Sequence, residues 1–89
     1  MYYVYRIRSR VKPDQSFIGT SRNVKKRVLM HNSGQLEATR EYRPWIVSFY
    51  AAFSRKSLAK DFEDFLKSPA GKSFGRKHLW KKHEDHDPS

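Results

Sequence analysis

The sequence predicts an α/β fold in which a small three-stranded mixed or antiparallel sheet is flanked by helices, in the order ββαβαα. Two short β-type stretches enclose a Pro-Asp turn near the N-terminus, and a nine-residue apolar run occupies 45–53. Amphipathic helical patterns precede and follow that run. A chain of 89 residues can bury one modest core. We therefore expect one domain over 1–80 and a polar, disordered tail over 81–89, where no apolar residue offers an anchor.

The strands are predicted from side-chain alternation and turn residues. Residues 2–8 alternate so that Tyr3, Tyr5 and Ile7 share one face, which is typical of a strand. Pro13-Asp14 presets a turn, so residues 16–19 form the second strand of a hairpin. The run 45–53 is almost continuously apolar, which predicts a strand that is buried on both faces and central in the sheet.

The first helix is predicted over 22–32, with Ser21 as its N-cap and Gly34 just beyond its end. Its apolar stripe is thin and rests on Val24 and Val28. Residues 34–43 are polar, and we expect them to be irregular.

Two more helices are predicted after the third strand. Ser57 is the expected N-cap of a helix over 58–68. Pro69-Ala70-Gly71 should interrupt the chain before a short helix over 72–80 that turns Phe74 and Trp80 to the core. The apolar stripe of the longer helix consists of Leu58, Phe62, Phe65 and Leu66.

Composition narrows the function. Nineteen Lys and Arg against nine Asp and Glu give a net charge of +10, which favours a nucleic-acid partner. The absence of cysteine excludes disulfides, a cysteine nucleophile and thiolate metal sites. No long apolar run and no secretory leader pattern occur, so we expect a cytoplasmic protein without a membrane or small-molecule cofactor partner. An acidic protein partner and any oligomeric state stay open.

Glu63 is the first candidate for chemistry. With Ala59 and Leu66 it has helical spacing, which places its carboxylate at the edge of the buried face. One interpretation is an ion pair with Lys60 or Lys67. The other is a ligand for Mg²⁺, which takes one or two carboxylates and keeps several waters.

Three further residues have a structural and a functional interpretation. Arg27 and His31 stand at i and i+4 and could meet a phosphate together, or they could belong to a solvated basic helix face. Tyr5 is expected to pack in the core. Its phenol can act as a base only if neighbouring cations or a metal lower its pKa. The tail segment 83–86 lacks the spacing of a His-Glu-x-x-His zinc motif.

Several short motifs occur together over residues 2–80. They are Tyr3-Val4-Tyr5, Phe17-Ile18-Gly19, an Arg27-containing helix followed by His31-Asn32-Ser33-Gly34, Arg43-Pro44-Trp45, Glu63 three residues before Leu66-Lys67-Ser68, and Gly71-Lys72 with Phe74. In this combination the chain resembles the GIY-YIG nuclease superfamily. It is most similar to the short single-domain bacterial branch related to the N-terminal domain of the excinuclease C subunit.

The resemblance implies metal-dependent hydrolysis of DNA phosphodiester bonds by an endonuclease. Tyr5 would orient or deprotonate the attacking water, Arg27 would stabilise the transition state, and Glu63 would hold one Mg²⁺ or Mn²⁺ ion. His31 would line the site. The basic residues expected to contact nucleic acid are Arg22, Lys25, Lys26, Arg27 and Arg43.

Phe17 departs from the family pattern, because it stands where the second motif has a tyrosine. It fills the same space without a hydroxyl. Loss of one preorganised donor typically costs about 10²–10³ in rate. Three hypotheses therefore remain. The first is an active endonuclease, with or without selectivity for DNA structure, and the second is a DNA-binding module whose catalysis is weakened or lost. A basic scaffold for an acidic protein is a third.

Overall fold

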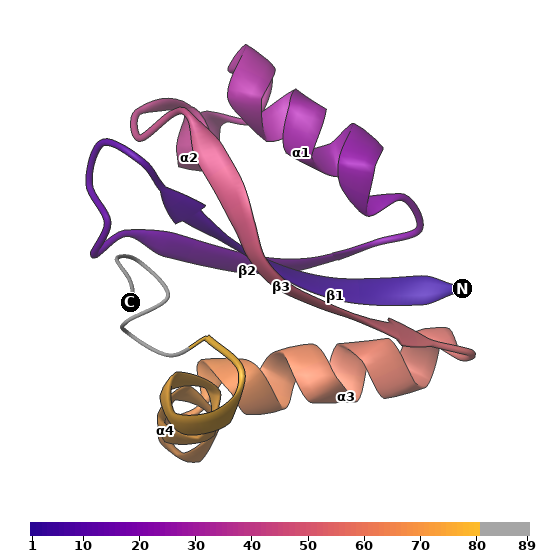
Figure 1. Cartoon of the computed structure of the whole chain (residues 1–89). Helices are drawn as coiled ribbons and strands as arrows, with labels where there is room; N and C mark the ends of the chain where they lie inside the picture. Colours follow the sequence, from indigo (N-terminus) through magenta and orange to yellow (C-terminus); the bar gives the residue numbers. More distant parts are fainter. Residues whose placement is uncertain (81–89) are drawn as a thin grey trace.

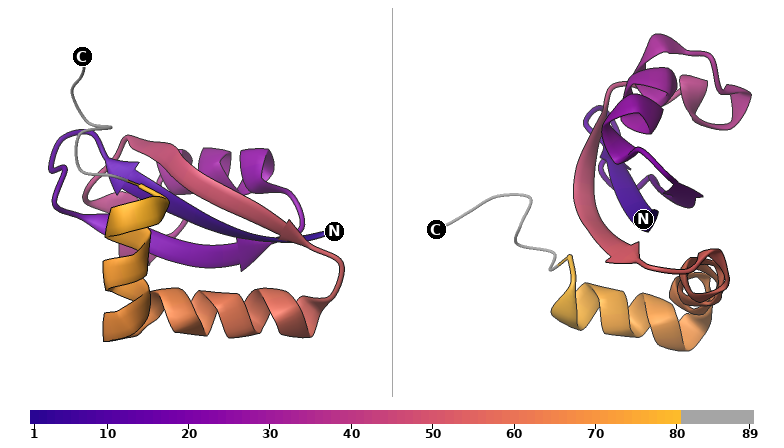
Figure 2. Two further views of the ribbon diagram at one scale, coloured as in Figure 1. Left: turned by 60° about the horizontal axis from the view of Figure 1, so that its bottom comes forward. Right: turned by 90° about the vertical axis from the view of Figure 1, so that its right-hand side faces the viewer.

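The computed structural model describes residues 1–80 as an antiparallel sheet between two layers of helices (Figures 1 and 2). The elements in chain order are β1 (Tyr2–Ser9), β2 (Ser16–Ser21), α1 (Val24–Ser33), α2 (Glu37–Arg40), β3 (Trp45–Phe53), α3 (Lys56–Lys67) and α4 (Pro69–His78). The predicted fold class is confirmed, and α2 adds a single helical turn within the segment 34–43 that was expected to be irregular. The predicted disordered tail and its 83–86 segment lie outside the described residues.

The sheet has the order β2-β1-β3, with both pairs antiparallel. Tyr5 on β1 faces Gly19 on β2 and Tyr50 on β3. The prediction that the 45–53 strand is central was wrong, because β1 takes that position. The strand is apolar on both faces for another reason: Phe49 and Phe53 pack toward α3, while Val47 and Tyr50 lie on the opposite face and stay exposed.

Each face of the sheet carries its own core cluster. On the α3 side, Val4 packs with Ala59, Leu66 and Trp80. On the α1 side, the second cluster consists of Tyr5, Ile7 and Trp45, with Phe17, Val24, Val28 and Tyr42 packed against it. The alternation predicted for β1 is confirmed by this division. A fully buried side chain such as Leu66 contributes about 1.5–3 kcal/mol.

The start of α1 differs from the prediction. Asn23, and not Ser21, is the N-cap, since its Oδ1 accepts the Lys26 backbone N–H at 3.0 Å. Ser21 is still paired with Tyr3 in the β-ladder, and its hydroxyl accepts the Asn23 N–H at 3.0 Å. Gly34 ends the helix as predicted, with the positive φ of 86° that glycine tolerates.

The junction between α3 and α4 also differs. Ser68 caps α4 by accepting the Gly71 N–H at 3.1 Å, and Pro69 begins that helix, where its missing N–H needs no partner. The sequence Pro69-Ala70-Gly71 therefore starts a helix and does not separate two. At the other end, α3 begins at Lys56 with Arg55 as its N-cap, so Ser57 lies inside the first turn.

The buried stripe of α3 is shifted from the one predicted. Ala59, Glu63 and Leu66 are its buried residues, whereas Leu58 and Phe65 are 47% and 39% exposed. Phe74, expected in the core, is 40% exposed on α4 and meets the ring of Phe65. The α4 layer instead contributes Trp80, which is buried as predicted and lies against Gly75, where a Cβ atom would clash with the indole.

Candidate active site

A chain of buried hydrogen bonds links β1, α1 and α2. The Tyr5 hydroxyl lies 2.7 Å from Nε2 of His31, and Nδ1 of the same ring lies 2.7 Å from Oγ1 of Thr39. All three side chains are at most 1% exposed. Both ring nitrogens of His31 are therefore occupied by protein groups, so its predicted contact with a phosphate is absent from this arrangement.

The direction of these bonds depends on the tautomer of His31, and the surroundings of Thr39 favour one of the two tautomers. The Thr39 hydroxyl points at the Leu36 carbonyl, at 3.5 Å, which leaves an oxygen lone pair for a donor. In the tautomer that this favours, Nδ1 of His31 carries the proton and donates to Thr39, and Nε2 accepts from the Tyr5 hydroxyl. Burial and the nearby Arg27 charge lower the pKa of His31. The ring is therefore neutral at pH 7 and carries one proton, on either Nδ1 or Nε2.

Arg27 connects this chain to the charged groups around it. Burial raises the pKa of Tyr5, while a hydrogen bond from Arg27 and its positive charge oppose that rise. The negative charge of Glu63 also raises the pKa of Tyr5. The phenol thus lies within electrostatic reach of both residues. Nε of Arg27 is buried and has no hydrogen-bond partner in residues 1–80.

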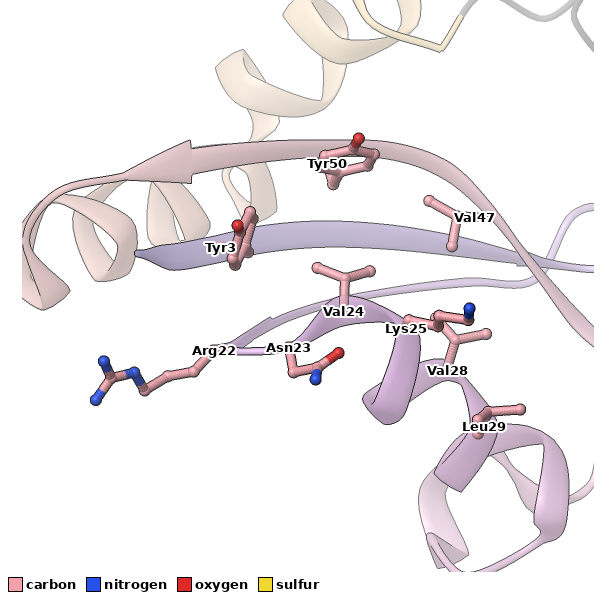
Figure 3. A pocket seen from close by; sticks show the side chains of 9 residues that line it. All are labelled: Tyr3, Arg22, Asn23, Val24, Lys25, Val28, Leu29, Val47 and Tyr50. Carbon is pink, nitrogen blue, oxygen red and sulfur yellow. The ribbon is translucent and has the colours of Figure 1, made fainter.

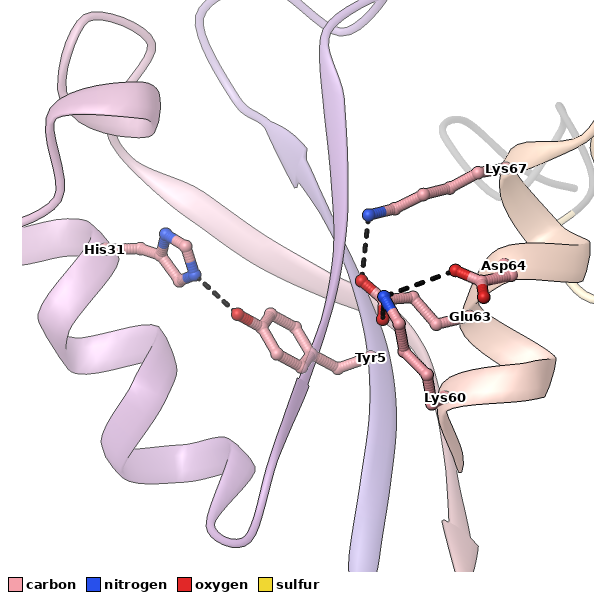
Figure 4. A network of polar contacts seen from close by, with 6 residues as sticks. All are labelled: Tyr5, His31, Lys60, Glu63, Asp64 and Lys67. Atoms are coloured by element: carbon pink, nitrogen blue, oxygen red, sulfur yellow. Dashed lines mark hydrogen bonds and ion pairs between the residues drawn. The ribbon is translucent and has the colours of Figure 1, made fainter. Parts of the chain in front are cut away.

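Glu63 reaches toward the sheet from α3, on the side opposite to α1 (Figure 4). It is 7% exposed, and its two oxygens meet the ammonium groups of Lys67 at 2.8 Å and Lys60 at 3.5 Å. The structural interpretation of Glu63, an ion pair with these lysines, is thereby confirmed. Both lysine side chains are more than half exposed, so they can release the carboxylate at small cost.

The donor set around Glu63 suits one kind of metal ion. Within residues 1–80 no three His, Asp or Glu side chains gather in one place, so a site held by protein ligands alone, of the zinc type, has no basis in that part of the chain. A single carboxylate fits Mg²⁺ or Mn²⁺, which accept waters and substrate phosphate as their remaining ligands. Glu63 offers one such carboxylate, at the buried face of α3.

Gly19 and Phe17 form the β2 side of the site. A Cβ atom on Gly19 would lie 2.9 Å from the Tyr5 hydroxyl, so glycine lets the phenol cross β2 closely. The Phe17 ring lies with its centroid 5.1 Å from that of His31 and 6.4 Å from that of Tyr5. Phe17 therefore lies beside both rings and brings no polar group to them.

Two cavities that include the lysine partners of Glu63 carry further cations. A cavity of about 410 Å³ on one side is lined by Arg22, Lys56 and Lys60 among others. A second one, of about 290 Å³, is lined by Phe17, Lys67 and Lys72. One face of α3 carries charged residues at i, i+4, i+7 and i+11, namely Lys56, Lys60, Glu63 and Lys67. This spacing is visible in the sequence, where only Lys60 and Lys67 were considered as ion-pair partners of Glu63.

The five predicted nucleic-acid contacts are distributed more widely. Arg22, Lys25 and Lys26 are exposed at the start of α1, and Arg27 is half-buried beside Tyr5. Arg43 is exposed and donates to the Arg40 carbonyl at 2.9 Å. Thr39 was missed altogether, because a lone threonine in a polar segment carries no pattern in the sequence.

Comparison with known proteins identifies the family. The model of the GIY-YIG catalytic domain matches residues 1–77, nearly the whole chain. The chain therefore belongs to the GIY-YIG family, as its motifs indicated, and this family consists of nucleases that bind DNA and generally depend on divalent metal. A search of the curated proteins found no match. No helix within residues 1–80 has the length and apolar character needed to cross a bilayer.

Proposed function

We propose that the protein is an active endonuclease that hydrolyses DNA phosphodiester bonds with one Mg²⁺ or Mn²⁺ ion held by Glu63. The proposal is supported by Tyr5 on β1, Arg27 on α1 and Glu63 on α3, because the charges of Arg27 and Glu63 both act on the pKa of the Tyr5 phenol. A phenol, a guanidinium and a carboxylate are the groups that water activation, phosphate stabilisation and metal binding require.

The proton path uses the buried chain of hydrogen bonds. As a water oxygen bonds to phosphorus and the P–O ester bond breaks, the water proton passes to the Tyr5 oxygen. The Tyr5 proton moves at the same time to Nε2 of neutral His31, 2.7 Å away. This path suits a phenol whose pKa is raised, because Tyr5 never has to ionise fully. The departing sugar oxygen takes a proton from solvent.

Arg27 and Glu63 supply the electrostatic part. The positive charge of the Arg27 guanidinium would stabilise the charge that builds up on the phosphoryl oxygens. Glu63 would leave Lys60 and Lys67 to hold the divalent ion, which when bound neutralises charge on the scissile phosphate. The released lysines then face the phosphates on either side of the scissile bond.

The test is cleavage of labelled single-stranded, duplex, nicked and branched DNA with Mg²⁺, Mn²⁺ or EDTA. Glu63→Gln should abolish metal-dependent cleavage. Its DNA affinity in EDTA should not fall, since the change removes a negative charge. Asp64→Asn is the matched control, because Asp64 also pairs with Lys60 at 3.3 Å but is exposed on the outer side of α3. Wild-type cleavage by Glu63→Gln would refute the metal assignment.

A second candidate function is a DNA-binding module without catalysis, and Phe17 is the observation in its favour. The Phe17 ring packs against His31 and lacks the hydroxyl that the tyrosine of the family motif has at this position. The same DNA panel separates the two functions. Tight, salt-sensitive DNA binding by the wild type with no cleavage in either metal would establish the module.

A further inference from the structure

A groove lies beside α1 on the flank away from Arg27 and His31. On this face of the sheet α1 covers Tyr5 and Ile7 but leaves part of β3 uncovered, and Val47 and Tyr50 are 40% and 61% exposed there. The groove has a volume of about 650 Å³. Figure 3 shows Tyr3, Tyr50 and Val47 of the sheet on one side of it and Leu29 of α1, 64% exposed, on the other.

The sheet side of the groove is aromatic. The rings of Tyr3 and Tyr50 meet edge to face, with centroids 6.3 Å apart and planes at 62°. This contact holds the two rings in place. Tyr50 has no helix over it, so a planar group can lie against its ring. Single exposed apolar residues are ordinary, whereas a hollow lined by several of them is typical of a binding site.

The rim of the groove is positive. Arg22 and Lys25 line it at the N-terminal end of α1, and none of its nine lining residues carries a carboxylate. The first turn of α1 also lacks an acidic residue, so the partial positive charge of the helix start is uncompensated there. An occupant that combines a flat apolar part with a negative charge therefore complements this surface best.

We propose that the groove binds an unpaired nucleobase of the DNA that the active site cleaves. The base stacks on Tyr50 beside Tyr3, and its phosphate lies at Arg22 and Lys25. The inference rests on the proposed function and deepens it. Arg22 lines both this groove and the cavity lined by Lys56 and Lys60, and Lys60 pairs with Glu63 at 3.5 Å. A strand that crosses the start of α1 would therefore pass these cations on its way to Glu63.

A second copy of the chain is a poorer occupant. Two copies that met symmetrically through this groove would bring the Arg22 and Lys25 side chains of both copies, four cations in all, into one interface. Each copy also carries a net charge of +10, which repels the other. Like charges placed together across an interface cost binding energy, whereas a nucleotide brings the opposite charge.

The test is DNA binding measured by fluorescence anisotropy in EDTA, so that no cleavage occurs. The probes are a short oligo-dT, an abasic oligomer of equal length and a blunt duplex. Tyr50→Thr keeps a good strand former at an exposed position and removes the ring. Tyr50→Phe keeps the ring. Phe74→Ala is the control, an exposed aromatic residue of α4.

Tyr50→Thr should bind oligo-dT about tenfold more weakly than the wild type, with Tyr50→Phe and Phe74→Ala close to wild type. The wild type should prefer oligo-dT to the abasic oligomer, and Tyr50→Thr should lose that preference. Equal oligo-dT affinity of Tyr50→Thr and wild type would overturn the inference, and so would a concentration-dependent dimer that only Tyr50→Thr abolishes. Wild-type binding to duplex alone refutes the base site and leaves the nuclease proposal intact. No binding to any probe refutes both.

Discussion

Replacing Thr39 by valine tests the hydrogen-bond chain at its far end. Valine has nearly the same shape as threonine but lacks the hydroxyl oxygen, which in the wild type lies 2.7 Å from Nδ1 of His31. The imidazole is 1% exposed, so water cannot take the place of the lost partner. The bond from Thr39 to Leu36 is 3.5 Å long and adds little. The change therefore isolates one buried N–H group.

The expected cost follows from that isolation. A buried donor left without a partner destabilises a protein by about 1–3 kcal/mol. For a domain of this size, 2 kcal/mol corresponds to a fall in Tm of roughly 8–16 °C. Thr39→Ser keeps the hydroxyl and loses one methyl group, which costs about 0.8 kcal/mol. Urea unfolding of the three proteins at pH 8, where His31 is neutral, gives both differences.

Nitrogen-15 chemical shifts of His31 provide the independent readout. In the wild type they should report a neutral ring protonated at Nδ1, and in Thr39→Val a mixture of tautomers. Once Nε2 carries a proton it no longer accepts from Tyr5, so the cleavage rate of Thr39→Val should fall further than that of Thr39→Ser. A wild-type ring protonated at Nε2, or a Thr39→Val free energy of unfolding equal to wild type, would refute the proton assignment.

Two further predictions concern Phe17 and pH. Phe17→Tyr should raise the rate of metal-dependent cleavage, by up to about 10²-fold, because it restores the hydroxyl of the family motif; an unchanged rate would mean that the site works without it. The lowered pKa of His31 makes stability depend on pH: the unfolded state binds more protons once the pH falls below about 6.5, so the free energy of unfolding should drop from there down to the folded pKa. Urea titrations from pH 8 to 4 should show this drop in the wild type and a smaller one in His31→Gln; equal slopes would contradict it.

The parts of the fold that the sequence predicted are those set by local periodicity. Alternation in β1 correctly predicted that Val4 and Tyr5 lie on opposite faces of the sheet. The spacing of Ala59, Glu63 and Leu66 predicted a carboxylate at the edge of the buried face of α3, where Glu63 is buried. Helix boundaries were less accurate, because several residues can cap the same turn. Whether Ser21 or Asn23 caps α1 depends on where the β-ladder to β1 ends, which is a tertiary fact.

The candidate site residues were predicted from the family motifs. The charges of Arg27 and Glu63 both act on the pKa of Tyr5, and the catalytic roles that the family pattern implies for the three residues stay predictions. Thr39 could not be found, because its position under His31 depends on how the short α2 helix folds back between α1 and β3. The Trp45 indole helps to fix that helix by donating to the Thr39 carbonyl at 2.8 Å.

The wrong placement of β3 is itself informative about function. A strand that is apolar on both faces is normally surrounded by protein, and that rule predicted a central position for 45–53. In the fold, Phe49 and Phe53 satisfy the rule on the α3 side, but Val47 and Tyr50 keep water contact on the other. Apolar side chains that the fold leaves uncovered, in a groove with a positive rim, match the needs of a ligand better than those of the core. The rule for buried strands therefore failed at Val47 and Tyr50, the two residues of β3 that line the proposed nucleotide groove.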